Sequence, residues 1–221
     1  MGFSSQFSLL ETVLLYAIPV ILAITLHEAA HGYVAKLLGD DTAWMLGRVT
    51  LNPIKHIDPV GTIAVPLALL LLSKLAGSGG LLFGWAKPVP VNFGNLRDPK
   101  SDMFWVAAAG PGANLFMALA WAILLKFSGP LDEVSFFAAM CVQGITINVV
   151  LMVLNLLPVP PLDGGRIMVS VLPNSLAYQF AKLERFGFPL IILLMVTGAL
   201  SVVMNPLVSA TLRGIQAVFG F

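Results

Sequence analysis

Long apolar stretches, separated by short polar or glycine- and proline-rich breaks, dominate this chain. The first stretch covers residues 9–38. Ser8 and Glu11 have the spacing of a helix capping box, and Gly39 follows as a C-terminal stop signal. This pattern predicts one long helix with a kink at Pro19, because proline removes a backbone hydrogen bond from a helix interior.

Later stretches predict further helices, with glycine and proline marking the breaks between them. The expected elements are an apolar stretch at 60–75 that dissolves into a glycine-rich segment, two spans at 103–127 and 134–157, a short helix after Gly165 that ends at Leu172, a polar-faced stretch around 182–185, an apolar run at 188–203 and an interfacial tail from Leu207.

Residues 85–92 follow a different pattern, because prolines at 88 and 90 alternate with valines. Proline cannot donate a backbone hydrogen bond, and valine favours extended backbone. The pattern therefore predicts an edge strand or a polyproline-like segment and excludes a helix.

Composition identifies the class of protein. The 221 residues are 58% hydrophobic and only 10% charged, and their mean hydropathy is +0.92. These values lie outside the average for soluble domains. We therefore expect an all-α polytopic membrane protein, a bundle of about four to six transmembrane helices with a re-entrant extended segment. The net charge of +1 argues against nucleic acid as a partner, and the single Cys141 excludes a cysteine-rich metal site.

Candidate chemistry begins with His27, Glu28 and His31 in the first predicted helix. Positions i and i+4 share one helix face, so both imidazoles can reach one metal ion while Glu28 stays free to take a proton from metal-bound water. Ionisable groups in a membrane helix are costly and usually mark function. The alternative is a histidine pair of the core or interface without a chemical role.

A catalytic zinc ion keeps three protein ligands and one open position, so a third ligand must come from elsewhere. His56 lies in a polar loop bounded by prolines, and we interpret it as a surface histidine. Asp163 follows prolines that break a hydrophobic helix, and a carboxylate there needs a partner. That partner is either a metal or, in a structural role, Arg166.

The sequence resembles the site-2 protease family of intramembrane zinc metalloproteases in two motifs together. One is the His-Glu-x-x-His helix. The other, Asn-x-x-Pro-x-x-x-x-Asp-Gly, is present as Asn155, Pro158, Asp163 and Gly164. The segment 109–114, Ala-Gly-Pro-Gly-Ala-Asn, is also similar. The resemblance covers about residues 9–172 and points to the compact branch without a PDZ or CBS domain.

This resemblance implies one Zn²⁺ per chain, held by His27, His31 and Asp163, with Glu28 as the catalytic base. It implies an intramembrane zinc metalloprotease whose partners are membrane-protein substrates and the lipid bilayer. We expect a single domain over residues 1–221, with a catalytic core at about 9–172 and C-terminal helices at about 175–221. The alternative function is a membrane metal-binding or metal-transport protein, although transport calls for more polar groups along the spans than this chain has.

Substrate contacts are open to two interpretations. The resemblance suggests that Asn155 positions substrate or stabilises an oxyanion, but helix capping or interhelical bonding explains such an amide equally well. Asn114 and Asn148 share this ambiguity, and for Asn148 we favour packing. The extended residues Lys87, Pro88, Val89, Pro90 and Val91 could hold substrate by β-addition or serve as a proline-stiffened connector.

Topology follows from requiring the two motifs to meet. His27 lies about 27 Å along a helix that starts at Leu9, near the far side of a hydrocarbon core about 30 Å thick. Basic residues follow at once, so we expect that face to be the cytoplasmic side of a prokaryotic membrane. Residues 76–91 must then return the chain to it, which places Asp40 and Asn95 on that face and Asp132 on the other.

Overall fold

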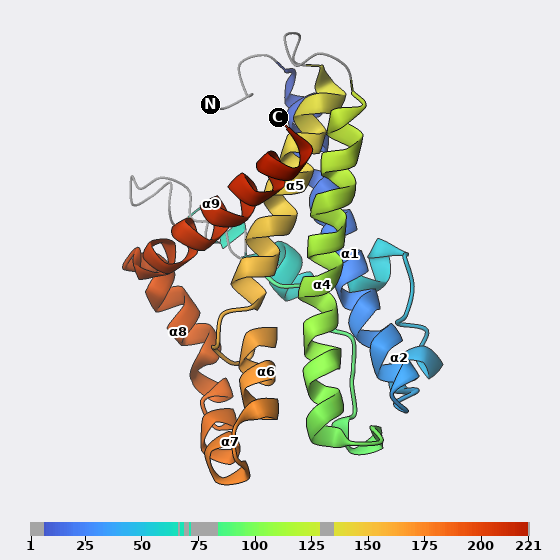
Figure 1. Cartoon of the computed structure of the whole chain (residues 1–221), viewed down its shortest axis with the longest axis vertical. Helices are drawn as coiled ribbons and strands as arrows, with labels where there is room; N and C mark the ends of the chain where they lie inside the picture. The colour runs from blue at the N-terminus through green and yellow to red at the C-terminus, as the bar shows by residue number, and fades with distance from the viewer. Residues whose placement is uncertain (1–6, 66, 69–70, 72–83, 129–134, 221) are drawn as a thin grey trace.

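The computed structural model describes residues 7–65, 67–68, 71, 84–128 and 135–220, and its regular elements are helices (Figure 1). Within these described residues, four helices are long: α1 (Leu9–Leu37), α4 (Pro99–Lys126), α5 (Phe136–Asn155) and α9 (Ala199–Phe219). The shorter elements are α2 (Thr42–Met45), η2 (Pro53–His56), the π-helix η3 (Pro59–Ala64), η4 (Phe93–Asn95), α6 (Asp163–Val171), α7 (Asn174–Ala181) and α8 (Glu184–Val196).

Each of the four long helices is long and apolar enough to cross a membrane. This confirms the predicted all-α polytopic bundle. The helix starts follow from local capping: the Ser8 and Glu11 side chains form the predicted capping box of α1. The Asp98 side chain caps α4, which begins at Pro99 and so starts four residues before the predicted Met103.

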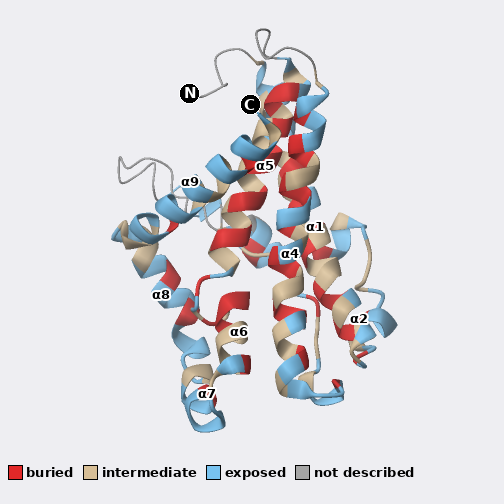
Figure 2. Cartoon of the chain, viewed as in Figure 1, coloured by how far each residue is buried: buried red, intermediate tan, exposed pale blue. Residues whose placement is uncertain are grey.

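Helices α1, α4 and α5 stand side by side and form the centre of the molecule (Figure 1). Their buried residues face one another, whereas the outer faces are exposed (Figure 2). Small residues such as Ala118, Ala122 and Ala139 are fully buried and let the helix backbones approach closely. Two of the metal-ligand candidates, His27 and His31, are among the buried residues of α1.

The C-terminal prediction was wrong in its boundaries. The expected apolar run at 188–203 is divided by Gly198, whose φ of +75° ends α8 and lets the chain turn into α9. The expected interfacial tail from Leu207 is the middle of α9. That helix crosses α5 and packs its buried Met204 and Ile215 into the core (Figure 1).

The segment from residue 84 to 92 is not helical, as predicted, and the structure adds that it lies beside α1, where the Val89 N–H bonds Glu28. The Asn92 N–H donates to the Asp40 carboxylate at 2.7 Å, and the Arg97 N–H donates to the Leu38 carbonyl at 3.1 Å. The chain thus returns to the C-terminal end of α1 before α4 begins. Most of the predicted apolar stretch after Ala64, and all of the glycine-rich segment after it, lies outside the described residues.

Candidate metal centre

Two helices bring three possible metal ligands together in the core. His27 and His31 lie one turn apart on α1, and Asp163 is the first residue of α6. The Nε2 atoms of the two histidines are 3.1 Å apart. Oδ2 of Asp163 lies 3.1 Å from Nε2 of His27, and Oδ1 lies 3.3 Å from Nε2 of His31. All three residues are buried. The sequence-predicted set, with Asp163 as its third member, is one compact group.

The donor set fits a divalent cation. The Nδ1 atom of His31 lies 2.6 Å from the Val106 carbonyl, which can only accept, so Nδ1 carries the proton and Nε2 of the neutral ring presents a lone pair. Oδ2 of Asp163 is buried and has no hydrogen-bond partner among the residues that the structure describes. One ligand atom from each residue lies within 4.8 Å of the others. Lone-pair atoms that converge in this way, with no N–H or O–H group of the three side chains between them, are typical of a metal site.

The chain before Asp163 explains how this carboxylate reaches α1. Helix α5 ends at Asn155, and prolines at 158, 160 and 161 prevent the helix from continuing, so α6 is a separate element. A side chain at Gly164 would place Cβ 2.3 Å from the Leu156 and Leu157 carbonyl oxygens. Only glycine therefore lets α6 begin directly against the end of α5.

Helix α4 closes the site from a third side through Gly110. A Cβ atom built there would lie 2.4 Å from Nε2 of His31 and 2.6 Å from Nε2 of His27. The absence of a side chain at Gly110 keeps the space beside both nitrogens open. The Ala-Gly-Pro segment that resembled the family thus forms one wall of the group.

Glu28 lies between the two histidines in sequence but does not join their group. Its Oε2 atom accepts a 2.8 Å hydrogen bond from the Val89 N–H of the extended segment. Arg48 holds the same segment through the carbonyls of Lys87, at 2.9 Å, and Pro88, at 3.3 Å. The predicted substrate segment is thus in direct contact with the predicted catalytic base.

The interpretation of His56 as a surface residue was wrong, and the alternative pairing of Asp163 with Arg166 is not formed. His56 is not a surface residue: it is 2% exposed, bonds the Thr50 carbonyl at 3.0 Å and accepts the Lys87 N–H on its own carbonyl. It is not part of the metal group. Arg166 does not pair with Asp163 but lies over the Phe93 ring, 5.9 Å from its centroid.

The three asparagines also separate into two kinds. Asn155 bonds the Leu151 carbonyl of its own helix at 3.0 Å, so its proposed contact with substrate stays a prediction. Asn114 and Asn148 are fully buried and bond each other across α4 and α5. Asn114 also contacts His27. The sequence left this role open, although an amide in an apolar helix next to the Ala-Gly-Pro segment was the available signal.

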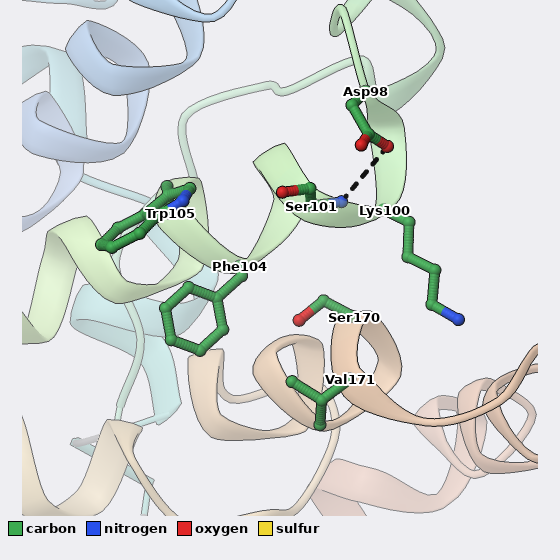
Figure 3. Close-up of a pocket in the computed structure, with 7 residues that line it drawn as sticks. All are labelled: Asp98, Lys100, Ser101, Phe104, Trp105, Ser170 and Val171. Carbon is green, nitrogen blue, oxygen red and sulfur yellow. Dashed lines mark hydrogen bonds between the residues drawn. The ribbon is translucent and has the colours of Figure 1, made fainter.

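A pocket of about 430 Å³ lies near the start of α4, where this helix faces the end of α6. Figure 3 shows Phe104 of α4 and Val171 of α6 on opposite sides of it, with Lys100 at its edge. The residues that line it are Asp98, Lys100, Ser101, Phe104, Trp105, Ser170 and Val171. None belongs to the metal group, so the pocket does not mark the metal site.

Comparison with known proteins agrees with this geometry. The model of Peptidase family M50 matches residues 129–197, which include Asp163. A Bacillus subtilis protein with the name "Putative zinc metalloprotease YwhC" is 39% identical over 214 residues, which cover 91% of this chain and 89% of the relative. "Putative zinc metalloprotease Rip2" of Mycolicibacterium smegmatis is 29% identical over 82% of this chain and 66% of the relative. No solved structure matches this chain significantly.

Proposed function

This chain belongs to peptidase family M50, the site-2 protease family, and from that premise we propose that it is a zinc-dependent endopeptidase acting on membrane-embedded protein substrates. The observation that carries the proposal is the buried group of His27, His31 and Asp163, with Glu28 next to His27 on α1. The zinc metalloprotease name of the Bacillus subtilis relative supports the choice of metal and of reaction.

We assign the ligand role to His27, His31 and Asp163, because their free acceptor atoms converge. Zinc held there supplies Lewis-acid chemistry, which polarises a scissile carbonyl and lowers the pKa of water. Glu28 takes the proton from the attacking water and passes it to the leaving amine. Its Oε2 atom is held by the Val89 N–H, and this bond orients the carboxylate and leaves the other oxygen for the proton.

Burial of the site supports substrate cleavage within or beside the bilayer. The three ligands lie among helices with the length and composition of membrane spans. They sit towards the end of α1, where basic residues follow in the sequence, so we place the site nearer the cytoplasmic face. Membrane proteins that expose an unwound peptide bond at this depth are the fitting substrates.

Residues 87–91 are the proposed holding strand for such a substrate. The N–H groups of Lys87 and Val89 already bond His56 and Glu28, and Pro88 and Pro90 have none. From Lys87 to Pro90 the strand can therefore only accept hydrogen bonds, and a substrate strand must donate its own N–H groups. Asn155 is proposed as an additional polar contact near the reacting carbonyl.

Disulfide trapping tests the strand. We expect a single cysteine replacing Lys87, in a cysteine-free Glu28→Gln background, to cross-link a substrate with one cysteine next to its scissile bond. An equivalent cysteine replacing the exposed Lys182 after α7 is the control. Equal cross-linking at both positions would remove residues 87–91 from the substrate path.

The function itself is tested with purified full-length protein and a helical membrane substrate, with and without chelator. Wild type should cleave, chelator should abolish cleavage and added zinc should restore it. Glu28→Gln should keep stoichiometric zinc but lose activity by about 10²–10⁴-fold, because proton transfer contributes about that much. Zinc binding without cleavage in wild type would favour the metal-binding or transport alternative.

A further inference from the structure

A chain of buried amides leads from His27 into the interior of the bundle. The Nδ1 atom of His27 lies 2.6 Å from Oδ1 of Asn114 on α4. Nδ2 of Asn114 donates to Oδ1 of Asn148 on α5 at 3.0 Å, and Nδ2 of Asn148 donates to the Gly144 carbonyl at 2.8 Å. Both asparagines are 0% exposed, so no solvent can replace these bonds.

The far end of this chain fixes its direction. A backbone carbonyl can only accept, so Asn148 must direct its NH₂ group to Gly144 and its oxygen to Asn114. The NH₂ group of Asn114 therefore faces Asn148, and it also lies 3.5 Å from the Ala23 carbonyl. With two acceptors at its nitrogen, Asn114 must turn its oxygen towards His27.

An oxygen at Nδ1 selects one form of the imidazole. His27 must carry its proton on Nδ1, and in the neutral ring Nε2 then keeps its lone pair. Nε2 is the atom that lies 3.1 Å from Asp163 Oδ2. The Val106 carbonyl accepts a hydrogen bond from Nδ1–H of His31, and Asn114 accepts the equivalent bond from His27. The difference is that the His27 bond depends on two side chains, Asn114 on α4 and Asn148 on α5.

We propose that Asn114, oriented by Asn148, is a positioning residue that holds His27 in the Nδ1-protonated form and thereby sets the zinc affinity of the site. This inference rests on the proposed zinc site. It explains why two costly amides are buried in apolar helices, although neither is itself one of the proposed ligands. When the ring nitrogen of a ligating histidine that faces away from the metal loses its hydrogen-bond partner, metal affinity typically falls by about 10–100-fold.

The test measures the zinc dissociation constant of the purified full-length protein by competition with a chelator. Asn114→Leu has a similar branched shape but cannot accept the hydrogen bond from Nδ1–H of His27, and we expect its dissociation constant for zinc to rise about 10–100-fold. Asn114→Asp still accepts that hydrogen bond, and its dissociation constant should stay within about threefold of wild type. Asn148→Leu should lie between them, because the Ala23 carbonyl still orients Asn114.

Rescue by aspartate separates positioning from packing. An unchanged dissociation constant in Asn114→Leu, or a loss in Asn114→Asp as large as in Asn114→Leu, would overturn the inference. If Asn114→Leu does not fold, Asn148→Leu decides, and wild-type affinity there would overturn it too. Failure of wild type itself to bind zinc would instead refute the proposed function.

Discussion

Gly110→Ala adds one methyl group at the point where α4 meets the proposed ligands. The new Cβ would lie 2.4 Å from Nε2 of His31 and 2.6 Å from Nε2 of His27. Carbon and nitrogen atoms that are not bonded need about 3.5 Å, so the two sides must separate by roughly 1 Å. The helix backbones are already in close contact there, so the imidazoles must move.

A shift of this size is large for a metal site. Ligand distances tolerate about 0.2 Å, so a displacement of roughly 1 Å is about five times too great. Overpacking of this kind costs about 1–3 kcal/mol, which corresponds to roughly 5- to 150-fold in an equilibrium constant. We therefore expect zinc affinity to fall by about 5- to 150-fold and cleavage to fall with it, because the methyl group and the metal compete for the same space.

The assay compares Gly110→Ala with Gly112→Ala in the same helix. A Cβ at Gly112 would meet no atom of the described part of the chain within 4 Å, so this control makes the same change in helix propensity without the clash. Zinc content by elemental analysis, the chelator-competition constant and cleavage rate are measured for both. Full zinc content and activity in Gly110→Ala would show that the metal does not sit beside the two Nε2 atoms, and would refute the assigned site.

Two further predictions concern the third ligand and the topology. Asp163→Ala should lose most bound zinc while His56→Ala should keep it, because Asp163 lies beside His27 and His31 and His56 does not. Elemental analysis measures the zinc content of both variants. The reverse result would make His56 the ligand. Single cysteines replacing Asp41 and Asn95 should react with an impermeant reagent only from the cytoplasmic side, and one replacing Asp132, which lies outside the described residues, only from the other. We choose Asp41 for this experiment because it is exposed, whereas Asp40 is fully buried. Labelling of the cysteine at position 95 from outside would contradict the proposed orientation.

Local patterns in the sequence determined much of this protein. The capping box of Ser8 and Glu11 set the start of α1, and the four-residue spacing of His27 and His31 set their common face, because both effects act within one or two helical turns. The prolines at 88 and 90 required an extended segment by removing backbone donors. The prolines before Asp163 made it a third-ligand candidate by breaking a hydrophobic helix, and the motif that ends in Asp163 and Gly164 supported it through its resemblance to the family.

Burial and partners in space required the tertiary structure. A polar, proline-bounded loop looks like surface in sequence, yet His56 is buried because the extended segment folds over it and bonds its carbonyl. The boundary between α8 and α9 was likewise hidden, because a glycine in an apolar run marks a break only when its φ is positive.

The contacts that finish the site were out of reach for the same reason. His27 and Asn114 are 87 positions apart, Glu28 and Val89 are 61 apart, and Asn114 and Asn148 are 34 apart. Periodicity and capping act over a few residues and cannot specify such pairs. Only the packing of α1, α4 and α5 decides which amide meets which imidazole, and it does so because buried polar groups must find partners within the bundle.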